Sequence, residues 1–232
     1  MLLNEARWIG QELARLDSAD LSPVLNVGSA TAAFREQVQP WIDQEIFAPL
    51  RKRGVRIDHL DIQEGDGIDL RGDLTDDNFV DNLRVRGYRA LMCCNVLEHV
   101  ADPRAISAKL ERVVKPGGYL VITVPNRFPY HPDPIDTRFR PGLTELSALF
   151  PNCRVVVGTL LDCGTGWDYV DRSLLAMISK VKRRMSGLQE HGGVKGSASF
   201  LAWLFRTFRQ TCALLVKTEP PVEAIAIPES TQ

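Results

Sequence analysis

Between residues 24 and 124, short apolar runs alternate with stretches of helical pattern, and this alternation most constrains the fold. The apolar runs predict strands at 24–27, 55–61, 67–74, 89–97 and 119–125. Strands that alternate with helices need crossover connections, which build a mainly parallel, doubly wound α/β sheet.

The helical stretches contain residues that are typical of helix starts and ends. Residues 1–20 have an amphipathic pattern and predict an N-terminal helix. A second stretch covers 31–53, and we expect Pro40 and Pro49 to divide it. A third covers 102–118, where Asp102 caps the start, Pro103 lies in the first turn and Pro116-Gly117-Gly118 ends the helix.

The pattern after residue 124 is less regular. It predicts strands at 153–161 and 211–218, a helix at 168–185 and a loop at 191–199. Residues 200–209 mix aromatic and basic side chains, a pattern compatible with a weak peripheral membrane contact, but we favour a core or dimer helix. We expect one domain over 1–218: an N-terminal helix (1–20), a core (21–161), and a C-terminal helical insert with the last strand (162–218). Residues 219–232 would be a mobile tail.

Composition excludes some classes of partner. A formal net charge of -1 argues against a dedicated nucleic-acid binder. The five cysteines form no pairs of C-x-x-C motifs, so we expect no metal site. An odd cysteine count, no signal peptide and no apolar run of about 18 residues favour the cytoplasm.

Polar residues and a glycine follow the predicted strands: Asn26, Gly28, Asp61, Asp73 and Asn95. Ligands of doubly wound sheets bind beyond the carboxyl ends of the strands, so we expect these residues to share one crevice. A carboxylate at Asp61 can accept hydrogen bonds from both hydroxyls of a ribose. Asp73 could bind the amine of an adenine with Leu74 against the ring, and Asn26 and Asn95 could hold an amino-acid moiety.

Four segments occur in a recognisable order: "VLNVGSATA", "HLDIQEGDGIDLRGDL", "ALMCCNVLEHVADP" and "LERVVKPGGYLVITVPN". Over residues 20–160 the chain resembles the class I S-adenosylmethionine-dependent methyltransferases that act on small molecules. The resemblance implies a Rossmann-like, seven-stranded sheet that ends in an antiparallel hairpin, made here by 153–161 and 211–218. It also implies S-adenosylmethionine as the cofactor, bound by Asn26, Gly28, Ser29, Asp61, Asp73, Leu74 and Asn95.

The first segment departs from that family's pattern. Asn26 stands where an acidic residue is usual, and Ala30 and Ala32 stand where glycines are usual. We expect a degenerate cofactor loop, in which the alanine methyls narrow the approach to the cofactor, although alanine needs no unusual torsion in many such loops. Asp61 also lies farther from Gly28 than the usual spacing of about 20 residues, because the segment 39–54 intervenes.

The acceptor side is expected in the proline-rich loop 126–142, which follows the fifth strand. His131, with Asp133, is the candidate general base for a hydroxyl acceptor, although both could instead brace the turn. Glu98 and His99 are expected to pack and to cap the start of the next helix rather than to act in catalysis.

The predicted reaction is methyl transfer from S-adenosylmethionine to a hydroxyl of a small molecule or glycan-type acceptor. The alternative is a non-catalytic S-adenosylmethionine-binding or structural module of the same fold. A nicotinamide-dependent oxidoreductase is disfavoured, because Ala30 breaks the G-x-G-x-x-G pattern and "NVLEHV" would stay unexplained. A homodimer is compatible with the sequence.

Overall fold

The computed structural model describes residues 1–131, 135–169 and 205–218 and contains a seven-stranded sheet of order β3-β2-β1-β4-β5-β7-β6. The strands are β1 (Val24–Val27), β2 (Ile57–Asp61), β3 (Leu70–Arg71), β4 (Ala90–Cys94), β5 (Tyr119–Arg127), β6 (Cys153–Thr165) and β7 (Thr207–Lys217). β1 to β5 pair in parallel, whereas β7 pairs antiparallel with both β5 and β6. The predicted fold class, a mainly parallel sheet with a C-terminal antiparallel hairpin, is confirmed.

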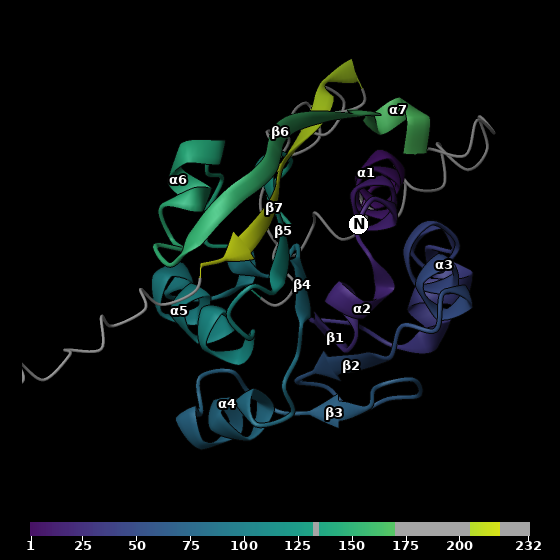
Figure 1. Cartoon of the computed structure of the whole chain (residues 1–232). Coiled ribbons are helices and arrows are strands. Elements are labelled where there is room, and N and C mark those ends of the chain that lie inside the picture. The colour runs from purple at the N-terminus through teal and green to yellow at the C-terminus, as the bar shows by residue number, and fades with distance from the viewer. Residues whose placement is uncertain (132–134, 170–204, 219–232) are drawn as a thin grey trace, which may run out of the picture.

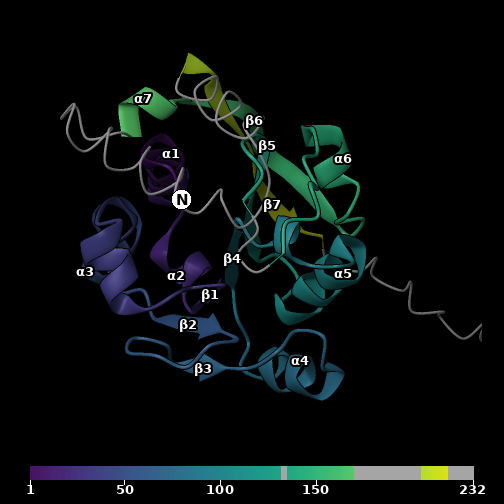
Figure 2. The ribbon, with the colours of Figure 1, turned by 180° about the vertical axis from the view of Figure 1, so that it is seen from behind.

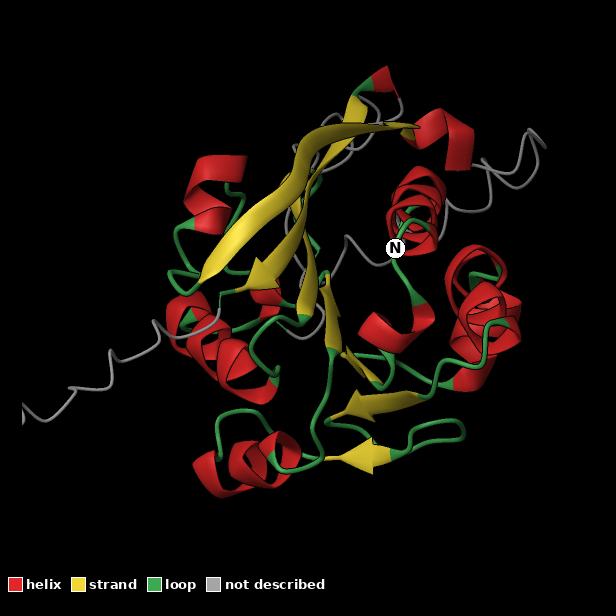
Figure 3. Cartoon of the chain, in the orientation of Figure 1, coloured by secondary structure: helices red, strands yellow, loops and turns green. Residues whose placement is uncertain are grey.

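Helices cover both faces of this sheet (Figures 1 and 3). Three lie on one face: α1 (Leu3–Ala14), α2 (Ser18–Leu21) and α3 (Ala48–Lys52). Three lie on the other: α4 (Asp77–Arg84), α5 (Pro103–Val113) and α6 (Leu143–Ser147). The view from behind in Figure 2 shows the same division. Shorter elements are α7 (Gly166–Tyr169), the π-helical turns η1 (Phe34–Val38) and η2 (Asp43–Phe47), and the 3-10 turn η3 (Leu97–His99).

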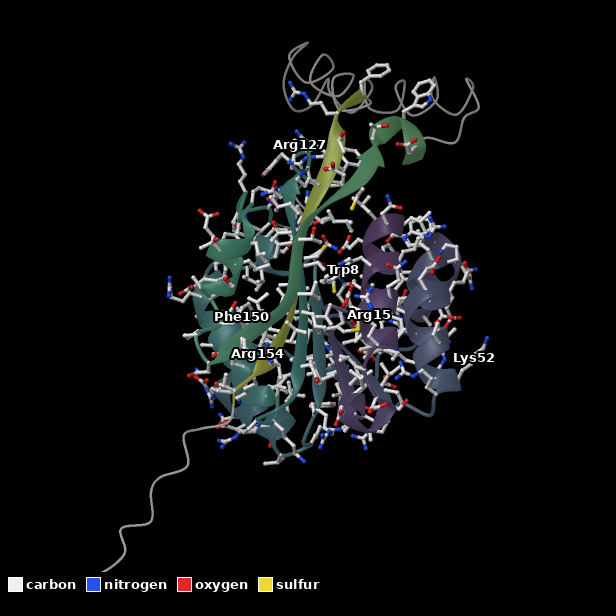
Figure 4. All side chains as sticks on the ribbon, turned by 45° about the horizontal axis from the view of Figure 1, so that its top comes forward. Trp8, Arg15, Lys52, Arg127, Phe150 and Arg154 are labelled. Carbon is white, nitrogen blue, oxygen red and sulfur yellow. The ribbon has the colours of Figure 1, made fainter. Side chains whose placement is uncertain are left out.

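Two hydrophobic cores follow from this layering, one on each face of the sheet. Side chains of a strand alternate between faces, so Leu25 packs in the core under α4, α5 and α6, whereas its neighbour Val24 packs in the core under α1, α2 and α3. Figure 4 shows Trp8 and Phe150 on opposite sides of the sheet, and each belongs to a different core. Both faces are therefore closed, and the open positions lie at the strand ends.

The predicted N-terminal residues of the helix after β4 are confirmed. The Asp102 carboxylate accepts a hydrogen bond from the Ala105 N–H at 3.0 Å, and Pro103 is the first helical residue. The helix ends at Val113, earlier than the predicted stop at Pro116, because Val114 already has an extended backbone with ψ 137°.

Two predictions about the N-terminal half are wrong. Residues 1–20 do not form one helix, because Asp17 is extended (ψ 143°) and starts the separate helix α2. Pro49 does not divide the second helical stretch, and η2 runs directly into α3. Pro49 lies at the start of α3, directly after the π-helical turn η2, and its fixed φ is compatible with the helical backbone there. Pro40, in contrast, falls between η1 and η2 as predicted.

The two C-terminal strands are longer than predicted. Residues 207–209 were expected in a helix but belong to strand β7, where Arg209 pairs with Arg127 of β5 and with Asp162 of β6. The expected helical insert from 162 also begins as strand, since β6 continues to Thr165. Most of the predicted helix 168–185, the loop 191–199, residues 200–204 and the tail 219–232 lie outside the described residues, so the domain boundaries stay a prediction. Among the helices that are described, none is long and apolar enough to cross a membrane.

Candidate active site

A pocket opens at the carboxyl ends of β1 and β4, where the strand order of the sheet reverses. Doubly wound sheets bind their ligands at this switch point. The cavity has a volume of about 180 Å³, and we call it the β1–β4 pocket. It is lined by Met1, Asn26, Gly28, Ser29, Ala30, Phe34, Arg35, Ile42, Phe47, Cys94 and Asn95. Four of the seven residues expected at the cofactor, namely Asn26, Gly28, Ser29 and Asn95, therefore meet in one place.

In the loop after β1, Gly28 and Ala30 both have a positive φ, although only Gly28 is a glycine. Gly28 has φ +66°, and a Cβ there would lie 2.4 Å from the Val96 side chain. Ala30 has φ +53°, in the left-handed region that costs an L-residue about 1–2 kcal/mol. The expectation that alanine needs no unusual torsion is thus wrong at this position.

Asp61 braces this loop from the end of β2. Its carboxylate accepts hydrogen bonds from the Ala30 N–H at 2.8 Å and the Gln63 N–H at 3.1 Å. The side chain is buried, with 9% of its residue surface exposed. A carboxylate has lone pairs beyond these two bonds, so Asp61 can also accept from a ligand hydroxyl.

The other two predicted cofactor residues do not line the β1–β4 pocket. Asp73 is exposed and accepts a hydrogen bond from the Thr75 N–H at 2.8 Å. Leu74 is buried in the core with Val27 and Leu60. Both follow β3, the strand next to β2, so an adenine at these residues would extend beyond the pocket along the sheet edge.

Arg35 is a feature of the pocket that sequence reasoning missed. Its guanidinium is buried and donates to the backbone carbonyls of Ser29 (3.1 Å), Gly67 (2.8 Å) and Ala30. Burial lowers the pKa of this group from its ordinary value. Arg35 therefore fastens the cofactor loop to the segment before β3. No signal in the sequence distinguishes it from the other arginines of the chain.

Glu5 of α1 is the second residue that was missed. It is completely buried, and its Oε1 accepts hydrogen bonds from Asn95 Nδ2 (2.7 Å) and Thr123 Oγ1 (2.6 Å). Asn95 itself has φ +55°. The N-terminal helix thus supplies a carboxylate beside the β1–β4 pocket, and the Asn95 amide that was expected to face a ligand is bound to it.

Asn26 contacts a histidine that stays neutral. Its Nδ2 lies 3.1 Å from His59 Nδ1 on the neighbouring strand β2. Burial lowers the pKa of His59 to about 4, and the positive charge of Arg35 acts in the same direction. At neutral pH the His59 ring can therefore accept a hydrogen bond from the Asn26 amide.

On the acceptor side, the loop after β5 folds back over η3. His131 and His99 pack ring to ring with centroids 5.1 Å apart, and Glu98 lies beneath them, completely buried. Burial lowers the pKa of His131 from its ordinary value. The predicted capping role of Glu98 and His99 is wrong, because Asp102 caps α5 instead. Asp133 lies outside the described residues.

Asp136 anchors the loop that carries His131. Its buried carboxylate accepts from Arg140 Nη2 (2.6 Å), the Arg138 N–H (2.8 Å) and the His131 N–H (3.0 Å). Burial alone would raise the pKa of Asp136, but these hydrogen bonds hold it well below its usual range. The loop is further joined to η3 by Thr137, whose N–H and hydroxyl both donate to the Glu98 carbonyl.

The strand order and the pairing of the strands together define a Rossmann-like, doubly wound α/β fold. Residues 44–122 match the family described as "Methyltransferase domain". This match covers about a third of the chain, and together with the fold it agrees with the resemblance to class I S-adenosylmethionine-dependent methyltransferases found in the sequence.

Among curated proteins, a ubiquinone biosynthesis O-methyltransferase of Xanthomonas oryzae pv. oryzae (strain PXO99A) is 31% identical over 117 residues. The aligned region covers 50% of this chain and 48% of that protein, and two other strains give the same values. The chain thus spans about half the length of the curated relatives it matches.

Solved structures share the fold at low identity. Coclaurine N-methyltransferase, bound to N-methylheliamine and SAH, has a TM-score of 0.51 at 12% identity, covering 89% of this chain and 68% of that one. The 4+2 cyclase SpnF has a TM-score of 0.55 at 13% identity, covering 92% and 82%. Since a cyclase and a methyltransferase share this fold, the fold alone does not settle the reaction.

Proposed function

We propose that this protein binds S-adenosylmethionine in the β1–β4 pocket and transfers its methyl group to a hydroxyl of a small molecule or glycan-type acceptor. The observation that carries the proposal is the meeting of Asn26, Gly28, Ser29 and Asn95 at the switch point of the sheet. A hydroxyl acceptor is supported by the curated relatives, which are O-methyltransferases.

In this proposal the cofactor lies across the ends of the first four strands. The methionine moiety binds near Asn26, Gly28, Ser29 and Asn95, the ribose at Asp61, and the adenine at Asp73 and Leu74. Support for the ribose position comes from Asp61, which already touches the loop through the Ala30 N–H at 2.8 Å. The cofactor is already a strong electrophile, so the protein mainly has to align the acceptor for in-line attack.

His131 is the proposed acceptor of the hydroxyl proton, and Asp133 is proposed to assist it. Burial lowers the pKa of His131, so the imidazole is in its neutral, proton-accepting form at pH 7, although the same shift makes it a weaker base. Its side chain is 32% exposed, whereas Glu98 beneath it is 0% exposed. His131 is therefore the residue of the two that an acceptor can reach.

A non-catalytic S-adenosylmethionine-binding module is the second candidate. It is favoured by the hydrogen bond between Asn95 and Glu5, which occupies an amide expected at the cofactor. The two candidates make different predictions about turnover. An enzyme releases S-adenosylhomocysteine when supplied with an acceptor, whereas a binding module holds the cofactor and forms no product with any hydroxyl compound.

The Asp73→Ala variant tests the cofactor assignment. We expect its affinity for S-adenosylhomocysteine in calorimetry to fall tenfold or more, because a lost hydrogen bond is worth about 0.5–1.5 kcal/mol and its orphaned partner adds to the loss. Asp81→Ala, on the exposed face of α4, is the matched control and should bind as the wild type does. Equal affinities of the two variants would contradict the proposed adenine position.

A further inference from the structure

Glu98 is a buried carboxyl group without a hydrogen-bond partner among the described residues. It is 0% exposed, and neither of its oxygens has a hydrogen-bond partner among the described residues. Buried polar groups almost always have a partner, and a buried unpaired carboxylate is among the costliest groups to leave unsatisfied. Within the described part of the chain, the Glu98 side chain therefore lacks the partner that its burial calls for.

The two histidines above Glu98 are held in one tautomer. His131 Nδ1 lies 3.0 Å from the Pro129 carbonyl, and His99 Nδ1 contacts the Ile135 carbonyl. A carbonyl oxygen can only accept, so in each neutral ring Nδ1 carries the proton and Nε2 keeps its lone pair. Metal-binding histidines are oriented in this way, with one ring N–H given to a carbonyl or carboxylate.

The lone pair of His99 faces the carboxylate directly. His99 Nε2 lies 3.7 Å from Glu98 Oε1, which is too long for a shared hydrogen bond. The repulsion between these two electron-rich atoms is relieved either by a proton, since burial raises the pKa of Glu98 to about 8, or by a bound cation. One ligand atom each from Glu98, His99 and His131 falls within 4.8 Å of the other two.

We propose that Glu98, His99 and His131 bind one divalent transition-metal cation. Zinc–ligand bonds of about 2.0–2.2 Å in a tetrahedral site put two ligand atoms about 3.3–3.5 Å apart. The separation between Glu98 and His99 is close to this value, and a ligand atom of His131 lies within 4.8 Å of both.

The donor set indicates which cations fit. Two imidazole nitrogens and one carboxylate suit zinc and its first-row neighbours, whereas magnesium and calcium prefer oxygen ligands alone. Three protein ligands leave a fourth position open, as in catalytic zinc sites. Cysteine is not part of the set, which is why the cysteine spacing gave no sign of it.

Asp136 has the position of a supporting residue for this site. Its Oδ2 lies 3.3 Å from His131 Nδ1, so the carboxylate orients the ring that would hold the ion. Arg140, at 2.6 Å, compensates the charge of Asp136. The carboxylate–histidine pair adds basicity to a metal-bound ring.

One consequence of the site depends on the proposed function. A hydroxyl acceptor bound at the open position loses its proton to solvent water more readily, because a bound cation lowers the pKa of a coordinated hydroxyl. Its oxygen then forms the new bond to the methyl carbon while the carbon–sulfur bond breaks and its electron pair stays on sulfur. In that case the bound ion, and not a free His131 side chain, would promote the loss of the hydroxyl proton.

Metal titration of the full-length, chelator-treated chain tests the proposal without cofactor or acceptor. We expect zinc to bind with one ion per chain in calorimetry, and cobalt(II) to give the visible absorption of a site with nitrogen and oxygen ligands. Glu98→Gln and His131→Asn should each weaken binding at least tenfold. Glu64→Gln, which changes an exposed carboxylate, is the matched control and should bind as the wild type does.

Three results would overturn the site: no binding of either cation, unchanged binding in both ligand variants, or a thiolate-type cobalt spectrum. His131→Asn changes a partly exposed side chain, so thermal unfolding can show that this variant is folded when its affinity is measured. Asp136→Asn should weaken zinc binding by roughly 10- to 100-fold. Failure of the metal site would leave S-adenosylhomocysteine binding unchanged, so the two proposals can fail separately.

Discussion

At the scale of single residues, the cofactor loop shows how a glycine-type turn persists after most of its glycines are replaced. Ala30 keeps the left-handed backbone, with φ +53°. Its N–H is bound by Asp61 and its carbonyl by Arg35, so contacts on both sides of the residue stabilise a conformation that alanine disfavours. Strain of this kind is typical of functional loops, where the surrounding structure over-determines the backbone.

The Ala30→Gly variant should be more stable than the wild type. Removing Cβ relieves a left-handed alanine, so we expect the free energy of unfolding to rise by about 1 kcal/mol. The measurement is urea denaturation. Ala33→Gly is the matched control, because Ala33 is helical with φ −56° and glycine there should cost about 1 kcal/mol. If both variants lose the same free energy of unfolding, the backbone of Ala30 is not strained.

His59 predicts a pH dependence of stability. Its pKa is about 4 in the folded protein and about 6.5 when unfolded. Between these values the unfolded chain binds more protons, so stability falls as the pH drops from 6.5 to 4. His59→Asn should show a shallower decline of melting temperature over this interval. Parallel curves for the variant and the wild type would show that His59 does not titrate in this way.

At the scale of elements, α1 does more than cover the sheet. It contributes Glu5 to the pocket edge, and its Gly10 lets the helix approach η2 closely. A Cβ at Gly10 would lie 2.2 Å from the Glu45 carbonyl oxygen. Glycine within a helix costs about 1 kcal/mol relative to alanine, so its presence here is explained by the contact. The position of α1 and that of Glu5 therefore depend on one small residue.

Gly10→Ala should destabilise the protein despite the better helix propensity of alanine. The added methyl meets backbone atoms that cannot rotate away, so we expect a loss of about 1–3 kcal/mol in urea denaturation. Gly142→Ala is the control, since its Cβ would have only ordinary contact with Glu145 at 3.8 Å. A gain of stability in Gly10→Ala would show that α1 does not pack against η2 as described.

At the scale of the whole molecule, the sequence predicted the parallel half of the sheet well. Strands such as β1 and β4 are apolar and bounded by clear turn residues, so their pattern is strong. Residues 207–209 were misread because a strand rich in aromatic and basic residues resembles an amphipathic helix. Its pairing with β5 and β6 is a tertiary contact that local pattern does not encode.

The candidate site was predictable only in part, for a related reason. Asn26, Gly28 and Asn95 follow strands, so the topology brings them together. Glu5 and Arg35 come from helices, and their roles depend on how those helices pack. Glu98 and His131 are separated by a whole strand and helix, so only the fold shows that their side chains meet.

The central claim is that the β1–β4 pocket holds S-adenosylmethionine, and a crystal structure of the protein soaked with S-adenosylhomocysteine tests it most directly. Our account predicts the homocysteine part between Asn26, Gly28 and Asn95, with both ribose hydroxyls at Asp61. Ligand density elsewhere on the chain, or a fully occupied ligand that leaves Asp61 and Asn95 without contact, would contradict it.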